Sequence, residues 1–381
     1  MKKQYNRELD LVKHLKKSSL FLFGPRNTGK SFLINASFRK TRYIDLLDMD
    51  LYSMLLRRPK ALEEIIDPKD KTVIIDEIQK IPSLLDVVHR LIETRKIHFL
   101  LTGSSARKIK RQGGNLLGGR AREFHLFPLT SHELGKDFDL LTYLNRGGLP
   151  RIYMSDEYEI DLKAYVHLYL VEEVKQEALV RNFDQFVRFL DTMGLANGEE
   201  LHFTNIANDS NISPRTLEGY LQVLEDTLIG FQVHSFFQTK KRKAITRSKF
   251  YFFDLGVTNY LANRGEIKAK SELFGRALEH FIALEIRAYL SYNNKRDALC
   301  YWRTKNGQEV DFVVGTKAAI EVKASTNVSD SELSGLRALR EEKLVEKFYV
   351  VSTNPIKRIV DDITILPVKE FLNLLWSKKL F

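Results

Sequence analysis

Residues 24–31 restrict the fold of this chain more than any other feature of its sequence. They read Gly-Pro-Arg-Asn-Thr-Gly-Lys-Ser and fit the pattern G-x-x-x-x-G-K-[ST] at every defined position. The apolar run Ser19–Phe23 precedes them, and the amphipathic stretch Phe32–Phe38 follows. A loop between a strand and a helix can turn consecutive N–H groups around a triphosphate, and the helix dipole adds positive charge there. The pattern therefore predicts a P-loop nucleotide site at the end of the first strand.

ATP and Mg²⁺ are the ligands expected at this loop. Lys30 is predicted to reach the β- and γ-phosphates, and the hydroxyl of Ser31 to ligate Mg²⁺. The residues predicted to contact the nucleotide are Gly24, Pro25, Arg26, Asn27, Thr28, Gly29, Lys30, Ser31, Phe32 and Thr102.

Three later segments supply candidate partners for the loop. The apolar run Val73–Ile75 ends in Asp76 and Glu77, predicted to hold Mg²⁺ through water and to polarise the attacking water, respectively. The run 99–105 ends in hydroxyls, of which either Thr102 or Ser104 is expected to sense the γ-phosphate. Arg120, in a glycine-rich segment, is a candidate to stabilise charge on the phosphate of its own subunit or of a neighbour's.

The hydrophobic pattern divides the chain into three parts. Residues 1–135 alternate short apolar runs with amphipathic stretches, which predicts a three-layer α/β fold with a parallel sheet. The middle part spans 136–268, and from about 136 to 235 its apolar residues recur every three or four positions, as helices require. Residues 269–381 contain an amphipathic helix over 271–291 followed by strand-like runs, which predicts a further α/β unit.

The middle part contains a helix-turn-helix pattern. Ser213 is expected to cap the second helix, with Pro214 at its first position, and that helix is expected to run through Leu228. The run Phe231–Phe237 is predicted to begin a wing. The pattern therefore favours a winged helix, although helix-turn-helix units are also common in pure packing roles.

The C-terminal part contains a second polar cluster. Alternation along a strand places Glu309 and Asp311 on one face, and Glu321 and Lys323 share a face of the next strand. If the two strands pair, Asp311, Glu321 and Lys323 converge. Asp311 and Glu321 could then bind Mg²⁺, Lys323 could orient a water for phosphodiester attack, and Glu279 could add a third carboxylate. The alternative is an exposed hairpin with cross-strand ion pairs.

Composition indicates which ligands and which cellular compartment suit this chain. Residues 1–150 hold 28 Lys and Arg against 17 Asp and Glu, a difference of +11 that equals the whole net charge, while residues 151–381 hold 32 of each. A basic first part favours polyanions such as nucleotides and nucleic acid. The single Cys300 excludes an internal disulfide, and no apolar run approaches the roughly 20 residues that span a bilayer. These features predict a cytoplasmic protein without a membrane partner.

Besides the P-loop and the Asp76–Glu77 strand, the chain contains the segments Leu101–Ser105, Phe127–Leu134, Gly147–Pro150, Tyr169–Val174, Tyr251–Gly256 and Gly275–Glu279. In this order, these motifs resemble one family, the AAA-type ATPases of bacteria and archaea that carry an uncharacterised C-terminal domain. The resemblance implies a RecA-like ATPase core, a winged-helix middle and a C-terminal domain of the PD-(D/E)XK nuclease fold. It implies nucleotide roles for Lys30, Ser31, Asp76 and Glu77, and nuclease-like roles for Glu279, Asp311, Glu321 and Lys323. Here Glu309-Val310 precedes Asp311, in place of the family's usual proline.

Three functions fit these features. The first is a Mg²⁺-dependent ATPase whose nucleotide state controls a DNA-directed nuclease-like domain. The second is a non-cleaving switch or adaptor that binds nucleic acid or a protein partner, and the third is a transcriptional regulator that acts through the winged helix. DNA is the expected polymer partner, and a second copy of the chain is a further candidate.

Overall fold

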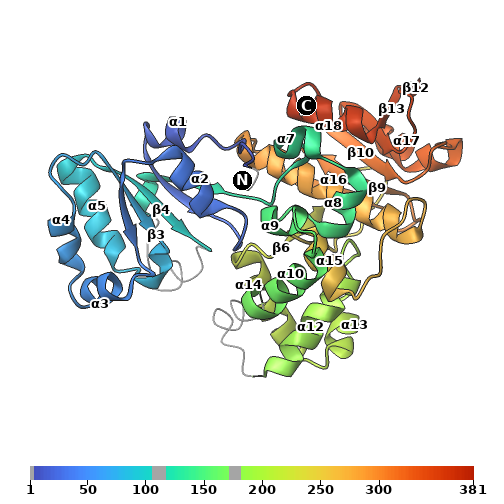
Figure 1. The fold of residues 1–381 in the computed structure, drawn as a ribbon. Helices are drawn as coiled ribbons and strands as arrows, with labels where there is room; N and C mark the ends of the chain where they lie inside the picture. The colour runs from blue at the N-terminus through green and yellow to red at the C-terminus, as the bar shows by residue number, and fades with distance from the viewer. Residues whose placement is uncertain (1–3, 105–116, 171–181) are drawn as a thin grey trace.

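The computed structural model describes residues 4–104, 117–170 and 182–381. The P-loop part lies to one side, and the middle and C-terminal parts pack together on the other (Figure 1). Of the predicted features, Ser105 and residues 171–174 lie outside the described residues. Within the described residues, no helix is both long and apolar enough to cross a membrane.

The first part is built on a five-stranded sheet with the order β2-β3-β4-β1-β5, in which every neighbouring pair is parallel. Alternating residues of β1 enter different cores: Leu20 and Leu22 pack toward α1 and α2, and Phe21 and Phe23 toward α4 and α5. The predicted three-layer parallel fold is therefore confirmed. Its elements are α1 (Leu11–Leu15), β1 (Ser19–Phe23), α2 (Lys30–Ser37), β2 (Arg42–Asp45), α3 (Met49–Arg57), α4 (Leu62–Ile65), β3 (Thr72–Asp76), α5 (Leu84–Arg95), β4 (His98–Gly103) and β5 (Ala121–His125), with short 3-10 turns η1 (Pro59–Ala61), η2 (Ile78–Lys80) and η3 (Leu117–Gly119).

The middle part is mainly helical, as its period predicted. Its core gathers aromatic and aliphatic side chains such as Phe186, Phe189 and Leu224. Helix α7 (Ser131–Leu134) ends the first part, and η4 (Gly135–Asp137) spans the boundary. The elements of the middle part are α8 (Leu140–Arg146), α9 (Pro150–Tyr153), α10 (Tyr158–Ala164), the π-helical turn η5 (Tyr165–Leu170), α12 (Phe183–Leu195), α13 (Phe203–Asp209), α14 (Pro214–Asp226), β6 (Gly230–Ser235), β7 (Lys249–Phe252) and α15 (Leu255–Leu261).

The helix-turn-helix segment forms as two helices followed by a hairpin. The hydroxyl of Ser213 accepts a hydrogen bond from the backbone N–H of Thr216, and Pro214 occupies the first turn of α14. The prediction that this helix includes Leu228 is wrong. The helix ends at Asp226, and Leu228 has a left-handed φ of 62° where the chain turns into β6. A winged-helix role for this unit stays a prediction.

A mixed eight-stranded sheet with the order β12-β13-β11-β10-β9-β8-β6-β7 joins the middle part to the C-terminal part. The joint is the parallel pairing of β6 with β8, where His234 lies beside Cys300 and Ser235 beside Tyr301. Helix α16 shares a core with the face of this sheet that holds Phe312 and Ile320, and α17 with the opposite face. The remaining elements are α16 (Glu272–Tyr292), β8 (Leu299–Arg303), β9 (Glu309–Val314), β10 (Ala318–Lys323), η6 (Asp330–Leu333), α17 (Ser334–Arg340), β11 (Lys347–Ser352), β12 (Arg358–Val360), β13 (Ile363–Pro367) and α18 (Val368–Trp376).

Candidate functional site

The P-loop connects the end of β1 to the start of α2, and its glycines are required by space and backbone conformation. Gly29 caps α2 with a φ of 96°, a region that favours glycine. A Cβ at Gly24 would lie 2.5 Å from the carbonyl oxygen of Leu126, so no larger residue fits there. The first amides of α2 have no partner within the helix and carry its positive dipole end. The loop therefore has the backbone that binding a phosphate requires.

The side chains of the loop are arranged around its own carbonyls. The ammonium of Lys30 is buried and donates to the carbonyl oxygens of Gly24 at 2.5 Å and Pro25 at 3.0 Å. The hydroxyl of Thr28 donates to Pro25 at 2.9 Å. The predicted contact residues Arg26, Asn27, Ser31 and Phe32 are exposed. Lys30 is therefore held at the centre of the loop.

The acid pair lies at the end of β3, next to β4, which separates β3 from β1. The buried carboxylate of Asp76 accepts hydrogen bonds from the hydroxyls of Thr102 and Tyr43. Glu77 has a left-handed φ of 59° and accepts from the side-chain amide of Gln79. Burial raises the pKa of Glu77, while Lys30 acts to lower it. A carboxylate with a raised pKa is suited to accept a proton from water.

The two hydroxyl candidates on β4 differ in their partners. Thr102 contacts the Asp76 carboxylate, and Ser104 lies 3.5 Å from the side-chain amide of Gln79. Thr102 therefore belongs to the network around Asp76. Both hydroxyls lie at the same end of β4 as the acid pair.

The donor set at this end of the sheet fits Mg²⁺, a hard cation that prefers oxygen ligands and retains several waters. The hydroxyl of Ser31 is exposed in the first turn of α2, and the Asp76 carboxylate is fixed by its two hydroxyl donors. These two residues would hold the ion.

Arg120 does not reach the P-loop of its own chain. It precedes β5, and the register pairs Ser19 with Ala121 and Phe23 with His125, so Arg120 lies at the opposite end of the sheet from the loop. Its guanidinium pairs with Glu93. Action on the same subunit's phosphate is therefore excluded by register, and action on a neighbour's stays a prediction.

Residues from the middle part approach the loop, and no sequence pattern marks them for a role there. The hydroxyl of Tyr165 donates to the carbonyl of Arg26 at 3.2 Å. A Cβ at Gly29 would lie 3.9 Å from Cγ of Pro150. The middle part thus contacts the loop from η5 and lies beside it at Pro150 of α9.

Asp254 fixes the segment that presents Pro150. Its buried carboxylate accepts from the backbone N–H of Gly148 at 2.7 Å and of Val257 at 3.1 Å, so it also caps α15. Burial raises the pKa of Asp254 to about 6. A Cβ at Gly147 would lie 2.1 Å from this carboxylate, which explains the glycine there. Two segments that are far apart in the sequence therefore form one structural unit.

Arg7 connects the P-loop to the rest of the molecule. Its buried guanidinium donates to the carbonyl of Thr28 at 2.6 Å, to that of Phe127 at 2.6 Å and to Glu133 at 2.9 Å. It also lies 3.3 Å from the hydroxyl of Tyr292, near the end of α16. A lone arginine near the N-terminus has no sequence signal that reveals this role.

The C-terminal candidates line one cleft of about 420 Å³. The antiparallel pairing of β9 with β10 confirms the predicted hairpin. Asp311 accepts from the backbone N–H of Val322 at 2.7 Å, and Lys323 donates to Glu321 at 2.6 Å. Glu279 of α16 lines the same cleft, so the structure brings all four predicted residues together.

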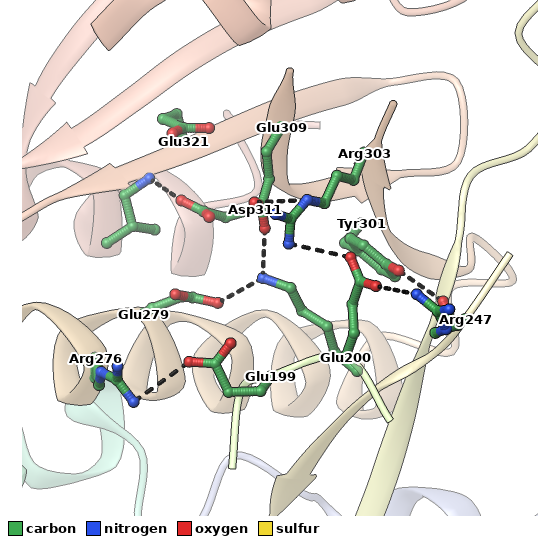
Figure 2. Close-up of polar contacts among 12 residues, drawn as sticks. Glu199, Glu200, Arg247, Arg276, Glu279, Tyr301, Arg303, Glu309, Asp311 and Glu321 are labelled. Carbon is green, nitrogen blue, oxygen red and sulfur yellow. Dashed lines mark hydrogen bonds and ion pairs between the residues drawn. The ribbon is translucent and has the colours of Figure 1, made fainter. Parts of the chain in front are cut away.

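Lys249, on β7, also enters this cleft, although no motif in the sequence marks it. Its ammonium lies 3.2 Å from Glu279 and 2.8 Å from Glu309. Figure 2 shows Glu279 on its helix and Glu309 on the neighbouring strand, with both side chains directed into the cleft. Burial acts to lower the pKa of Lys249, but the nearby carboxylates, with Glu279 the strongest, outweigh burial and raise it. The hydroxyl of Tyr251, also on β7, donates to Glu279 at 2.6 Å. The cleft is therefore formed jointly by the middle and C-terminal parts.

The fit of this cleft to a divalent metal is partial. Burial, followed by the charge of Glu321, raises the pKa of Asp311, and burial raises the pKa of Glu321 to about 7. Oε2 of Glu321 is buried and has no hydrogen-bond partner. Within residues 4–104, 117–170 and 182–381, no group of three or more His, Cys, Asp or Glu side chains is arranged to hold a metal ion. Asp311 and Glu321 remain the pair that would hold one.

Comparison with known families divides the chain into three segments. Residues 16–135 match the family AAA_14, described as an AAA domain. Residues 137–268 match a domain of unknown function, DUF8612, and residues 274–371 match another, DUF4143.

Two relatives are similar to most of this chain, and both carry the description uncharacterized protein. An uncharacterized protein of Methanocaldococcus jannaschii is 24% identical over an alignment 390 residues long. The alignment covers 87% of this chain and 81% of that protein. Another, from Haemophilus influenzae, is 23% identical over 346 residues, which cover 83% and 82%.

A solved structure from Pyrococcus horikoshii is also similar to part of the chain. It is a signal transduction ATPase with numerous domains and a tetratricopeptide repeat sensor. It is 14% identical with a TM-score of 0.24, and the similarity covers 78% of this chain and 49% of that one, about half its length. By its family matches, the 381-residue chain carries a segment similar to an AAA domain at residues 16–135 and a segment similar to the domain of unknown function DUF4143 at residues 274–371.

Proposed function

We propose that this protein is a Mg²⁺-dependent ATPase whose nucleotide state controls a nuclease-like cleft that acts on DNA. Support for hydrolysis comes from the P-loop lysine and from Glu77, a buried carboxylate beside the fixed Asp76. Support for control comes from Arg7, which contacts both the P-loop and α16.

The proposed hydrolysis uses residues of one sheet edge. Water attacks the γ-phosphorus, the bond from that phosphorus to the bridging oxygen breaks, and ADP leaves. Glu77 accepts the proton of the water, while Lys30 and the loop amides stabilise charge on the phosphate oxygens. Bound Mg²⁺, held by Ser31 and Asp76, would supply positive charge to the phosphates.

In this proposal, helix α16 carries the signal from the P-loop to the cleft. Tyr292 at the end of α16 contacts Arg7, and Glu279, 13 positions earlier on the same helix, lines the cleft. A change in the conformation of the P-loop carbonyl at Thr28 would alter the contact at one end of this helix. The helix would transmit that change to the carboxylate at its other end.

The test is an ATPase assay with and without DNA, run on the wild type, Lys30→Ala and Asp311→Ala. We expect Lys30→Ala to lose hydrolysis and Asp311→Ala to keep hydrolysis but lose its response to DNA. A DNA-nicking assay with Mg²⁺ or Mn²⁺ accompanies it, in which Lys323→Ala should be inactive. Unchanged hydrolysis in Lys30→Ala would refute the site, and equal nicking by Lys323→Ala would indicate a contaminant.

A second candidate is a switch or adaptor that binds DNA or protein without cleavage. One observation favours it: the ammonium of Lys249 already compensates Glu279 and Glu309. Saturable DNA or protein binding, with no Mn²⁺ between Asp311 and Glu321 in soaked crystals, would support this candidate. Metal at that position together with nicking would exclude it.

A further inference from the structure

We infer that Lys249 acts as a built-in cation in the C-terminal cleft and competes with a divalent metal for its carboxylates. The ammonium lies 3.2 Å from Glu279 and 2.8 Å from Glu309, and those residues come from α16 and β9 (Figure 2). The lysine itself comes from β7, so it enters from the middle part of the chain.

The position of Lys249 is enforced by its surroundings. Its side chain is 6% exposed, and its ammonium lies 5.4 Å from the ring centroid of Tyr301. Its strand is paired with β6, which in turn pairs with β8 of the C-terminal part. A buried ammonium must be paired to avoid a large desolvation penalty, and Glu279 and Glu309 provide that pairing.

The charges that line the cleft still favour a cation. Its lining includes six carboxylates against three cationic side chains. The carboxylates are those of Glu199, Glu279, Glu309, Asp311, Glu321 and Glu332, and the cations are those of Lys249, Arg303 and Lys323. The buried Oε2 of Glu321 has no hydrogen-bond partner, which marks an unused ligand position independent of the ion pairs. A divalent ion beside Glu279 would be repelled by the ammonium of Lys249, and this repulsion is weakly screened in a buried setting.

The competition gives the middle part a direct influence on metal binding. Lys249 sits on a strand of the hairpin that follows α14, whereas Asp311 and Glu321 belong to the C-terminal hairpin. Displacing β7 from α16 would withdraw the ammonium and free Glu279. The inference rests on the cleft of the proposed function, but not on hydrolysis of ATP or cleavage of DNA.

The test measures Mn²⁺ binding by the full-length protein without nucleotide, from the electron paramagnetic resonance signal of free Mn²⁺. The variants are Lys249→Met and, as a matched control, Lys317→Met, which removes a lysine paired with Asp297 in the same domain. We expect Lys249→Met to lower the dissociation constant at least tenfold and Lys317→Met to leave it unchanged. An equal or weaker affinity in Lys249→Met, or no binding by any of the proteins, would overturn the inference.

Two further comparisons keep the test decisive if Lys249→Met folds poorly. The double variant Lys249→Met/Glu279→Gln has no unpaired carboxylate at position 279. This double variant should bind Mn²⁺ more tightly than Glu279→Gln alone, because Glu309 loses its ion pair with Lys249 and becomes available. No tightening in this background would contradict the inference. Adding Asp311→Asn to Lys249→Met should abolish the gain, and a gain that survives would place the metal elsewhere and overturn the assignment.

Discussion

The guanidinium of Arg7 donates a hydrogen bond of 2.6 Å to the carbonyl oxygen of Thr28, inside the P-loop. The same group pairs with the buried Glu133, which forms a capping box with Thr130 at the start of α7. One side chain thus links the P-loop to the start of α7.

Arg7→Ala should destabilise the protein strongly, because it leaves the carboxylate of Glu133 buried without its charged partner. Breaking a buried pair in this way costs about 3–5 kcal/mol. The measurement is the free energy of unfolding in urea. Arg39→Ala, a change at an exposed arginine, serves as the control and should stay within about 0.5 kcal/mol of the wild type. Similar losses in both variants would contradict the role of Arg7.

Lys30→Ala and Glu77→Gln should separate binding from turnover. Lys30→Ala removes the charge that faces the phosphates, and we expect nucleotide affinity and hydrolysis to fall together. Glu77→Gln keeps the shape of the side chain but cannot accept the proton. It should bind ATP normally and hydrolyse it about 10²–10⁴-fold more slowly. Calorimetry for binding and phosphate release for turnover check both, with the exposed Glu64→Gln as the control. Normal turnover in Glu77→Gln would remove this residue from the mechanism.

Glu285 should make stability depend on pH. It is buried between α7 and α18, and burial raises its pKa from 4.5 to about 7 although Ser131 and Trp376 donate to it. The folded state therefore holds this proton more tightly than the unfolded state. Its contribution to stability is fully present below pH 4.5 and is lost as the pH rises through 7, a change of about 3 kcal/mol.

This pH dependence is checked by measuring the free energy of unfolding of the wild type and of Glu285→Gln at several pH values. Glu285→Gln cannot titrate, so the unfolding free energy of the wild type minus that of the variant should decrease between pH 5 and 8. Glu272→Gln, at an exposed position of the same helix, should give a flat difference. A flat difference for Glu285→Gln as well would show that burial does not shift this group.

Gly148→Ala should destabilise the protein, because the added Cβ would lie 2.2 Å from the hydroxyl of Tyr143 and 2.6 Å from the carbonyl oxygen of Leu129. Overpacking of this kind costs about 1–3 kcal/mol. Gly219→Ala on α14 is the matched control, because the added Cβ would meet no atom within 4 Å apart from its chain neighbours and its own helix backbone. Alanine also favours a helix over glycine by up to about 1 kcal/mol. Thermal unfolding should move in opposite directions in the two variants. A shift in the same direction would contradict the close packing at Gly148.

Features that depend on neighbouring residues were predictable from the sequence. The P-loop between β1 and α2, the acid pair at the end of β3 and the carboxylates of β9 and β10 all follow from local patterns and strand alternation. The hairpin that brings Asp311 to Glu321 follows from two adjacent apolar runs and a short turn.

Features that depend on distant pairing were not predictable. The glycine-rich segment around Arg120 makes this arginine a candidate for the phosphate site. Only the register of β5 against β1 shows that Arg120 lies at the end of the sheet away from the P-loop. Arg7 and Lys249 are single basic residues without a motif around them, and their partners lie 126 and 30 positions away in the chain. Their roles require the packing of separate parts of the molecule.

The pairing of β6 with β8 has a practical consequence for anyone who expresses fragments. A fragment that starts near residue 269 would expose the edge of β8 along its hydrogen-bonding groups and would lose Lys249, leaving acidic side chains to repel one another. Such a piece is expected to aggregate. A junction between β5 and α7 severs no strand pairing, but it separates Arg7 from Glu133 and leaves that buried carboxylate without its charged partner.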